Sequence, residues 1–129
     1  MIIIIDYGAG NSGSIKNMLK RAGIDSIISF DKGHIKKAHK LILPGVGSFD
    51  CGMQKLIECD LVDLLNNKVL EEKVPILGIC LGAHLFTKRS EEGKLNGLGW
   101  FDAETVKFDF DNNNSGLKIP HMGWNEAPL

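Results

Sequence analysis

The chain has 129 residues, enough for one domain with a real hydrophobic core. Hydrophobic residues make up 43% and charged residues 24%, as in ordinary globular domains. The net charge of −1 gives no bulk attraction to nucleic acid or to an anionic membrane, and no segment approaches the length of a membrane span. Three cysteines form an odd set without metal-ligand spacing, which favours a reducing, cytoplasmic environment.

Four short apolar runs are predicted to form strands. Residues 2–5 are an unbroken run of isoleucine, which is typical of a strand buried on both faces of a parallel sheet. Residues 26–30, 41–43 and 76–79 are further apolar runs of strand length.

Helices are predicted between these strands. Residues 14–22 carry apolar side chains at helical spacing, and residues 32–39 form a short polar helix or turn. Residues 52–70 form a longer helical region with a break suggested near Cys59 and Asp60, and another helix follows Cys80.

Strands that alternate with helices at this spacing indicate βαβ units. The expected fold class is α/β, with a three-layer, doubly wound, mostly parallel sheet. Sites in such sheets form at the carboxyl ends of the strands. The loops over residues 7–13, 44–48 and 78–82 should therefore gather at one edge.

The pattern changes after Ser90. Polar and apolar residues alternate in part over residues 100–110, as in an antiparallel strand, and residues 109–116 form a polar turn. Residues 117–121 can pair back on this strand, so the sequence predicts a C-terminal β-hairpin.

The most informative stretch is Gly78-Ile-Cys-Leu-Gly82, at the point where a buried strand breaks into a helix. A nucleophile between small residues in a strand–turn–helix is the geometry of a nucleophile elbow. A lone buried cysteine is more often an inert apolar residue. The glycines on either side, Gly78 and Gly82, reverse this preference and predict covalent catalysis by Cys80. Cys51 and Cys59 have no such pair of flanking glycines.

The loop Pro44-Gly-Val-Gly47 ends a neighbouring strand. By itself this loop predicts only a tight turn into the next helix. Beside an elbow it suggests part of an oxyanion hole, in which backbone N–H groups stabilise the negative charge that develops during the reaction. The second donor in an elbow enzyme is the N–H of the residue after the nucleophile, here Leu81.

A cysteine nucleophile also needs a general base, normally a histidine oriented by a carboxylate. His34 and His39 lie in a lysine-rich polar segment and are expected to be solvated, and His121 has no evident acidic partner. His84 lies one helical turn after Cys80, but the elbow turns the cysteine away from regular helix geometry. The sequence therefore predicts no convincing pair of a histidine base and an orienting carboxylate.

Four motifs in order resemble one family closely. They are Asp6-Tyr-Gly-Ala-Gly-Asn11 with Ser14, Leu43-Pro-Gly-Val-Gly47, the Cys80 elbow, and Pro120-His-Met-Gly-Trp-Asn125. Together they resemble the glutaminase subunits of imidazole glycerol phosphate synthase, which are class I (triad) glutamine amidotransferases. The resemblance spans essentially the whole chain and implies a flavodoxin-like fold.

The resemblance implies specific roles. Cys80 would attack the side-chain carboxamide of glutamine, giving a γ-glutamyl thioester and ammonia, and water would then release glutamate. The amides of Val46 and Leu81 would hold the oxyanion. Glu92 and His84 match positions that contact the bound glutamine. No cofactor and no metal are implied.

The resemblance also implies a partner. Ammonia would pass to a (β/α)₈-barrel cyclase subunit, in a heterodimer that makes imidazole glycerol phosphate during histidine biosynthesis. Asn11, His121, Trp124 and Asn125 would lie toward this partner.

Two departures from the family pattern matter. His84 stands where the family usually has glutamine; an imidazole can still donate one hydrogen bond. The family continues past the Trp-Asn motif into strands that carry a catalytic His-x-Glu pair, whereas this sequence stops at Leu129. We therefore expect residues 1–129 to be an amidotransferase domain incomplete at its C-terminus, with no appreciable turnover alone.

Two alternatives stay open at this point. The chain could be a non-catalytic interaction subunit that keeps the partner-facing loops, with His84 reflecting relaxed selection. It could also be a paralogous amidotransferase that supplies ammonia for amidation of a surface-polysaccharide sugar. A general cysteine hydrolase would leave the Pro-His-Met-Gly-Trp-Asn motif unexplained.

Overall fold

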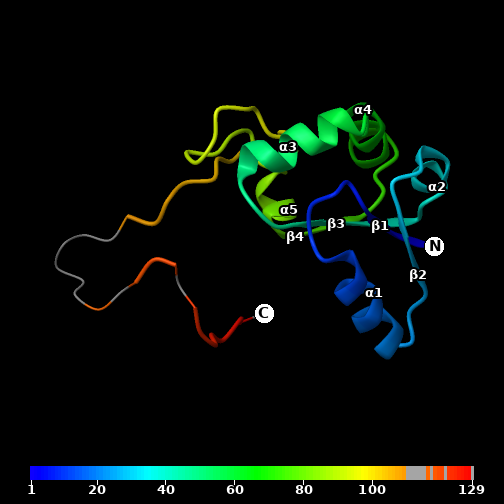
Figure 1. Cartoon of the computed structure of the whole chain (residues 1–129), viewed down its shortest axis with the longest axis horizontal. Helices are drawn as coiled ribbons and strands as arrows, with labels where there is room; N and C mark the ends of the chain where they lie inside the picture. The colour runs from blue at the N-terminus through cyan, green and yellow to red at the C-terminus, as the bar shows by residue number, and fades with distance from the viewer. Residues whose placement is uncertain (110–115, 117, 121, 129) are drawn as a thin grey trace.

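A parallel sheet of four strands forms the centre of the molecule (Figure 1). The computed structural model describes residues 1–109, 116, 118–120 and 122–128. The strands are β1 (Ile2–Ile5), β2 (Ser26–Ser29), β3 (Lys40–Gly45) and β4 (Ile76–Cys80). Their order is β2-β1-β3-β4 and every ladder is parallel. The chain thus winds outward from β1 in both directions, which confirms the predicted doubly wound α/β class.

Helices cover both faces of this sheet. They are α1 (Ser12–Arg21), α2 (Lys32–Lys36), α3 (Phe49–Glu58), α4 (Val62–Asn66), the π-helical segment η1 (Asn67–Glu71) and α5 (Leu81–His84). Helix α1 lies on one side of the sheet, and α3, α4 and α5 lie on the other (Figure 1). The helices among the described residues are all too short to form an apolar membrane span.

The alternation of side chains along the strands divides the core in two. Ile3, Ile5 and Leu43 belong to the larger cluster, with residues of α3, α4 and α5. Ile4 and Ile42 point to the opposite face and pack with α1. Because successive strand residues face opposite sides, a run such as residues 2–5 must be apolar throughout.

Most predicted helix limits are confirmed to within a few residues. The side chains of Asn11, Asp31 and Ser48 each accept a backbone N–H bond at the start of a helix. The break expected near Cys59 is present, since α3 ends there and Asp60 has a φ of 52°.

Residues 100–109 do not form the predicted antiparallel strand. Thr105 instead makes an isolated parallel bridge with Ser90, and Trp100 and Phe101 pack their rings against Phe86. These contacts hold the segment as a loop against the end of α5, so the partial alternation reflects contacts of single residues rather than a pleated surface. The second arm, over residues 117–121, lies in part outside the described residues.

The turn from β4 into α5 packs against the end of β3. A Cβ atom on Gly82 would lie 1.9 Å from the carbonyl oxygen of Leu43, and one on Gly78 would lie 2.6 Å from the Cα of Ala83. Both neighbours are backbone atoms that cannot move aside cheaply. Glycine is therefore required on both sides of Cys80.

The substitution Gly82→Ala tests this close approach. We expect it to lower the free energy of unfolding by about 3 kcal/mol, because the added methyl group overpacks the backbone of β3. Urea unfolding followed by circular dichroism measures the change.

A matched control is Gly13→Ala, at the second position of α1. The nearest atom to its added Cβ is 3.9 Å away, and alanine favours a helix by up to about 1 kcal/mol relative to glycine. Equal stability of the two variants would contradict the proposed packing.

Candidate active site

Cys80 occupies the turn between β4 and α5. Its backbone has a φ of 54° and a ψ of −121°, a conformation that costs an ordinary residue about 1–3 kcal/mol. Its side chain is an exposed, free thiol. A strained, exposed cysteine between a strand and a helix is the backbone geometry of an elbow, and the role of Cys80 as the nucleophile stays a prediction.

The end of β3 lies directly beside this cysteine. In the parallel ladder Gly45 pairs with Cys80, so the following residues, Val46 and Leu81, leave the sheet at the same point. A Cβ atom on Gly45 would lie 2.6 Å from the amide nitrogen of Gly82. This arrangement suits two backbone N–H groups shared by one anion; their role as an oxyanion hole stays a prediction.

Tyr7 fixes the end of β3 through a side-chain hydrogen bond. Its hydroxyl donates a hydrogen bond of 2.7 Å to the carbonyl oxygen of Pro44, and its side chain is buried. Burial, with a smaller contribution from Cys51 nearby, raises the pKa of the Tyr7 phenol above its ordinary value. The phenol thus stays protonated and remains a donor.

A hollow of about 500 Å³ opens beyond the exposed end of α5. Its lining residues are His84, Ser90, Glu91, Glu92, Thr105, Val106 and Lys107. His84 ends the short helix that follows Cys80, so one residue of the lining lies about one helical turn from the elbow. The lining offers two carboxylates, one ammonium and one imidazole, groups that suit a small zwitterionic ligand.

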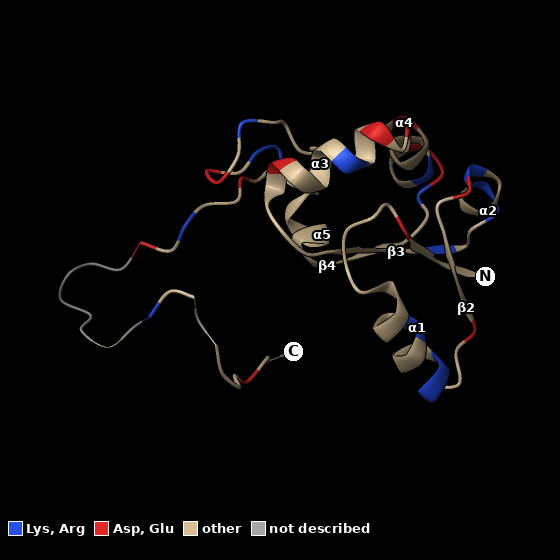
Figure 2. Cartoon of the chain, viewed as in Figure 1, with Lys and Arg blue, Asp and Glu red and all other residues tan. Residues whose placement is uncertain are grey.

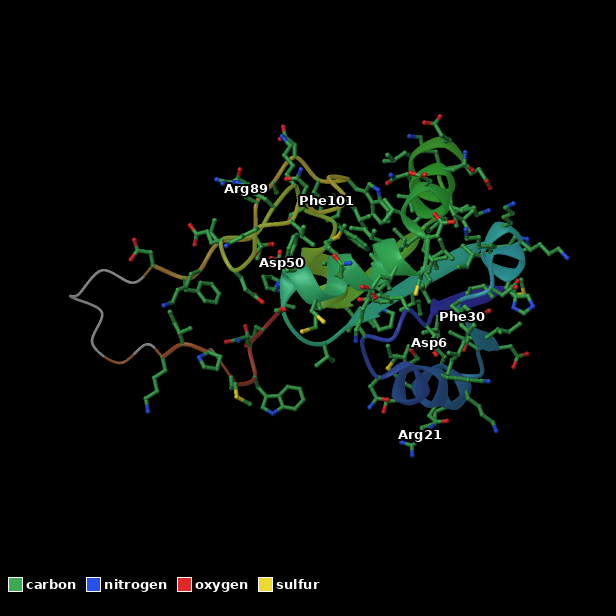
Figure 3. All side chains as sticks on the ribbon, turned by 45° about the horizontal axis from the view of Figure 1, so that its top comes forward. Asp6, Arg21, Phe30, Asp50, Arg89 and Phe101 are labelled. Atoms are coloured by element: carbon green, nitrogen blue, oxygen red, sulfur yellow. The ribbon has the colours of Figure 1, made fainter. Side chains whose placement is uncertain are left out.

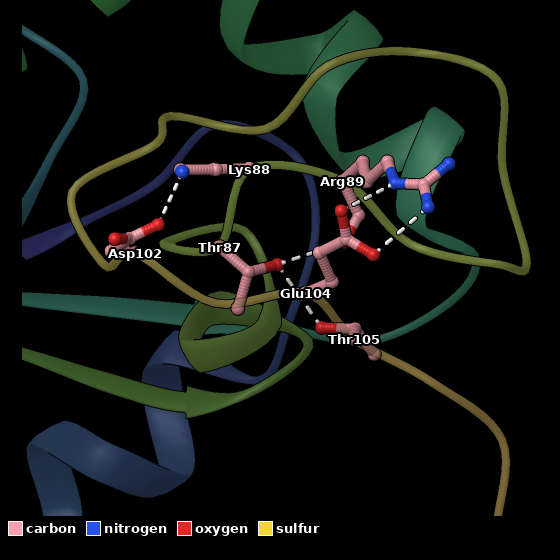
Figure 4. A network of polar contacts seen from close by, with 6 residues as sticks. All are labelled: Thr87, Lys88, Arg89, Asp102, Glu104 and Thr105. Carbon is pink, nitrogen blue, oxygen red and sulfur yellow. Dashed lines mark hydrogen bonds and ion pairs between the residues drawn. The ribbon is translucent and has the colours of Figure 1, made fainter.

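Polar contacts join residues 87–89 to residues 102–105, the two segments that lead into the walls of the hollow (Figure 4). Arg89 and Glu104 form an ion pair at 2.8 Å, Lys88 pairs with Asp102, and the hydroxyls of Thr87 and Thr105 are 3.1 Å apart. The hydrogen bond and charge of Arg89 lower the pKa of the Glu104 carboxyl. These ion pairs are exposed, so they fix geometry more than they add stability.

Glu92 lies between this hollow and α3. One of its carboxylate oxygens accepts a hydrogen bond of 3.0 Å from the backbone N–H of Phe49, the first residue of α3. Its second oxygen has no protein partner within the described part of the chain. Glu92 therefore combines a structural contact with a free oxygen near a ligand-sized space.

The histidines do not supply an evident base. His34 bonds to the hydroxyl of Ser29, and His39 bonds to the N-terminal amine of Met1; both are exposed, as expected. Within residues 1–109 no hydrogen bond joins a histidine to the thiol of Cys80. His84 lines the hollow, and His121 lies outside the described residues.

The other residues expected near a partner have mixed surroundings. The side chain of Asn11 accepts a hydrogen bond of 3.1 Å from the N–H of Ser14, so it caps α1. Trp124 is fully exposed, at 103% of its reference area. Asn125 is also exposed. Their position at an interface stays a prediction, as it does for His121.

A metal centre finds no support in the described residues, where no three His, Cys, Asp or Glu side chains gather.

Two residues of the site were not singled out from the sequence. Tyr7 was noted only as part of a glycine-rich loop, and Asp50 lay between the loop predicted over residues 44–48 and the helical region predicted over residues 52–70. The carboxylate of Asp50 accepts backbone N–H bonds from Lys94 and Leu95, which are 44 and 45 residues away, and no pattern near Asp50 in the sequence signals these partners. The partner of Tyr7 lies 37 residues away and has no such signal either.

Comparison with known proteins identifies the family. The glutamine amidotransferase class-I family profile matches residues 3–127, and the chain belongs to this family. It is 62% identical over 125 residues to "Imidazole glycerol phosphate synthase subunit HisH 2" of Methanococcus maripaludis, covering 97% of this chain and 60% of that protein. A protein with the same description in Pseudomonas aeruginosa is 48% identical, with 98% and 61% covered. The chain thus spans about 60% of the length of these relatives.

A solved structure supports the fold. The structure described as "Crystal structure of glutamine amidotransferase" has a TM-score of 0.68 and 24% identity, over 92% of this chain and 60% of that one. At this identity the likeness concerns the fold alone.

The variant Tyr7→Phe tests the anchor of β3. It removes one hydroxyl and leaves the buried carbonyl of Pro44 without its donor, so we expect a loss of about 1–3 kcal/mol in the free energy of unfolding. Urea unfolding measures it.

Ser26→Ala is the control, since the Ser26 hydroxyl is buried without a partner among the described residues. This change should leave stability equal or higher. If Tyr7→Phe were as stable as the parent chain, the Tyr7 bond would have no part in holding β3.

Proposed function

We propose that this chain forms the cysteine-bearing part of a glutaminase that releases ammonia from glutamine. The strained, exposed Cys80 thiol at the start of α5, the helix whose last residue His84 lines a hollow with two carboxylates, is the observation that carries this proposal. The family membership and the names of the relatives agree with it. Residues 1–129 are proposed as a single amidotransferase domain.

The proposed reaction is acyl transfer to sulfur. The Cys80 sulfur attacks the carboxamide carbon of glutamine, a C–S bond forms, and the amide C–N bond breaks. The thiol proton goes to the departing nitrogen, which leaves as ammonia. A water oxygen then attacks the thioester, its proton returns to sulfur, and glutamate leaves.

Backbone N–H groups would stabilise the charge that develops on the carboxamide oxygen. Val46 and Leu81 are the proposed donors, because both follow directly after the paired residues Gly45 and Cys80. Such a donor is typically worth about 3–4 kcal/mol of the barrier.

The hollow would hold the amino-acid end of glutamine. The free oxygen of Glu92 would accept from the substrate ammonium, as an oppositely charged group in a partly enclosed space. His84 would donate a hydrogen bond from the position that the family usually fills with glutamine. Because no described histidine bonds to Cys80, the reactivity of the thiol toward a glutamine analogue is a more direct test than turnover.

The ammonia would serve a synthase partner. The relatives are described as subunits of imidazole glycerol phosphate synthase, which favours a heterodimer with a (β/α)₈-barrel cyclase in histidine biosynthesis. Asn11, His121, Trp124 and Asn125 are the proposed interface residues. The free cysteines favour a cytoplasmic location.

A glutamine analogue with a chloromethyl ketone in place of the carboxamide tests the proposal. The Cys80 sulfur displaces chloride, and peptide mass mapping locates the adduct. We expect labelling of Cys80 that saturates with the chloroketone. Glutamine at about ten times its Kd should slow labelling about tenfold, by simple competition.

Two variants control the experiment. Cys80→Ala should abolish the saturable label, and Cys51→Ala, which removes another exposed thiol, should leave it unchanged. Labelling that never saturates, or that glutamine does not slow, would refute the proposed glutamine site.

A further inference from the structure

A reciprocal clamp joins α3 to one wall of the hollow. The carboxylate of Asp50, in the first turn of α3, accepts backbone N–H bonds of 2.9 Å from Lys94 and from Leu95. In the other direction, Glu92 accepts from the N–H of Phe49. Figure 3 labels Asp50 at the start of α3, close to the loop that contains these residues.

The clamp has a steric requirement. A Cβ atom on Gly93 would lie 2.2 Å from a carboxylate oxygen of Asp50, so only glycine lets the carboxylate come this close to the loop. The hydrogen bonds from Lys94 and Leu95 also hold the pKa of the Asp50 carboxyl below its usual range. The acceptor is thus charged at neutral pH, and its bonds to N–H groups are of the stronger, charge-assisted kind.

The clamped loop is also a wall of the hollow. Ser90, Glu91 and Glu92 line it, and the hydroxyl of Ser90 accepts from the N–H of Glu92. Loops of this kind are mobile unless side chains tie them down. Asp50 is not among the residues that line the hollow, yet it holds the two residues that follow Gly93.

We propose that Asp50 is a positioning residue that, through Gly93, sets where the carboxylate of Glu92 stands in the hollow and so how tightly the amino-acid end of the substrate binds. This inference rests on the proposed function. The inference goes beyond the proposed function because it gives a role to Asp50, a residue that does not touch the substrate. Loss of the Asp50 contacts should not change the reactivity of Cys80, because backbone contacts with β3 hold the elbow.

Labelling by the same chloroketone separates binding from reactivity. Asp50→Ala should raise the concentration for half-maximal labelling about tenfold to a hundredfold, the range expected when a binding group is misplaced. The maximal labelling rate should not change. The rate with iodoacetamide, which needs no amino-acid pocket, should not change either.

Three further variants sharpen the test. Asp50→Asn keeps one acceptor oxygen, so it should fall between the parent and Asp50→Ala. Gly93→Ala should imitate Asp50→Ala, because its methyl group displaces the carboxylate. Asp63→Ala, which removes an exposed acid from the first turn of α4, should behave like the parent.

The double variant Asp50→Ala/Gly93→Ala distinguishes a clamp from two separate defects. Once the carboxylate is gone the added methyl group has room, so the double variant should be no worse than Asp50→Ala alone. Hydrogen exchange should show faster exchange of the Lys94 and Leu95 amides in all variants that break the clamp.

The outcomes separate the two proposals. Saturable, glutamine-protected labelling that is unchanged in Asp50→Ala would overturn the positioning role and leave the glutaminase proposal intact. Effects that add in the double variant, or a parallel loss of iodoacetamide reactivity, would also overturn it. Labelling of the parent chain that never saturates would overturn both.

Discussion

The close approach of the β4–α5 turn to the end of β3 is the constraint on which the site depends. Gly82 lies so near the carbonyl of Leu43 that no side chain fits between them, and a Cβ atom on Gly45 of the neighbouring strand would lie 2.6 Å from the amide nitrogen of Gly82. With both flanks fixed, Cys80 adopts a positive φ that it would not adopt alone. The exposure of the thiol is thus a consequence of backbone packing.

A second level of organisation is built from side chains. Tyr7 fixes the end of β3 through Pro44, and Asp50 fixes the loop that carries Glu92. The two anchors differ in kind, since the first is a buried neutral donor and the second a charged acceptor near solvent. The first favours a rigid backbone at the end of β3, beside Cys80. The second allows the wall of the hollow that carries Glu92 to be changed by substitutions that leave Cys80 in place.

Local patterns predicted the parts of the molecule that local physics determines. The isoleucine run of β1 and the glycine spacing around Cys80 are patterns within a few residues of sequence, so the sequence could show them. The contacts of Tyr7 with Pro44 and of Asp50 with Lys94 join residues 37 and 44 positions apart. No pattern in the residues next to Tyr7 or Asp50 predicts these contacts. The expected strand over residues 100–110 failed for the same reason, because Ser90 and the ring of Phe86 determine where that segment lies.

The most direct measurement is a crystal structure of the protein after reaction with the chloroketone. The account predicts a bond from the Cys80 sulfur to the ligand, with the ligand ammonium within hydrogen-bond distance of Glu92 and its oxygen facing the amides of Val46 and Leu81. A ligand bonded to Cys80 whose amino-acid end lies outside the hollow, away from His84 and Glu92, would contradict it.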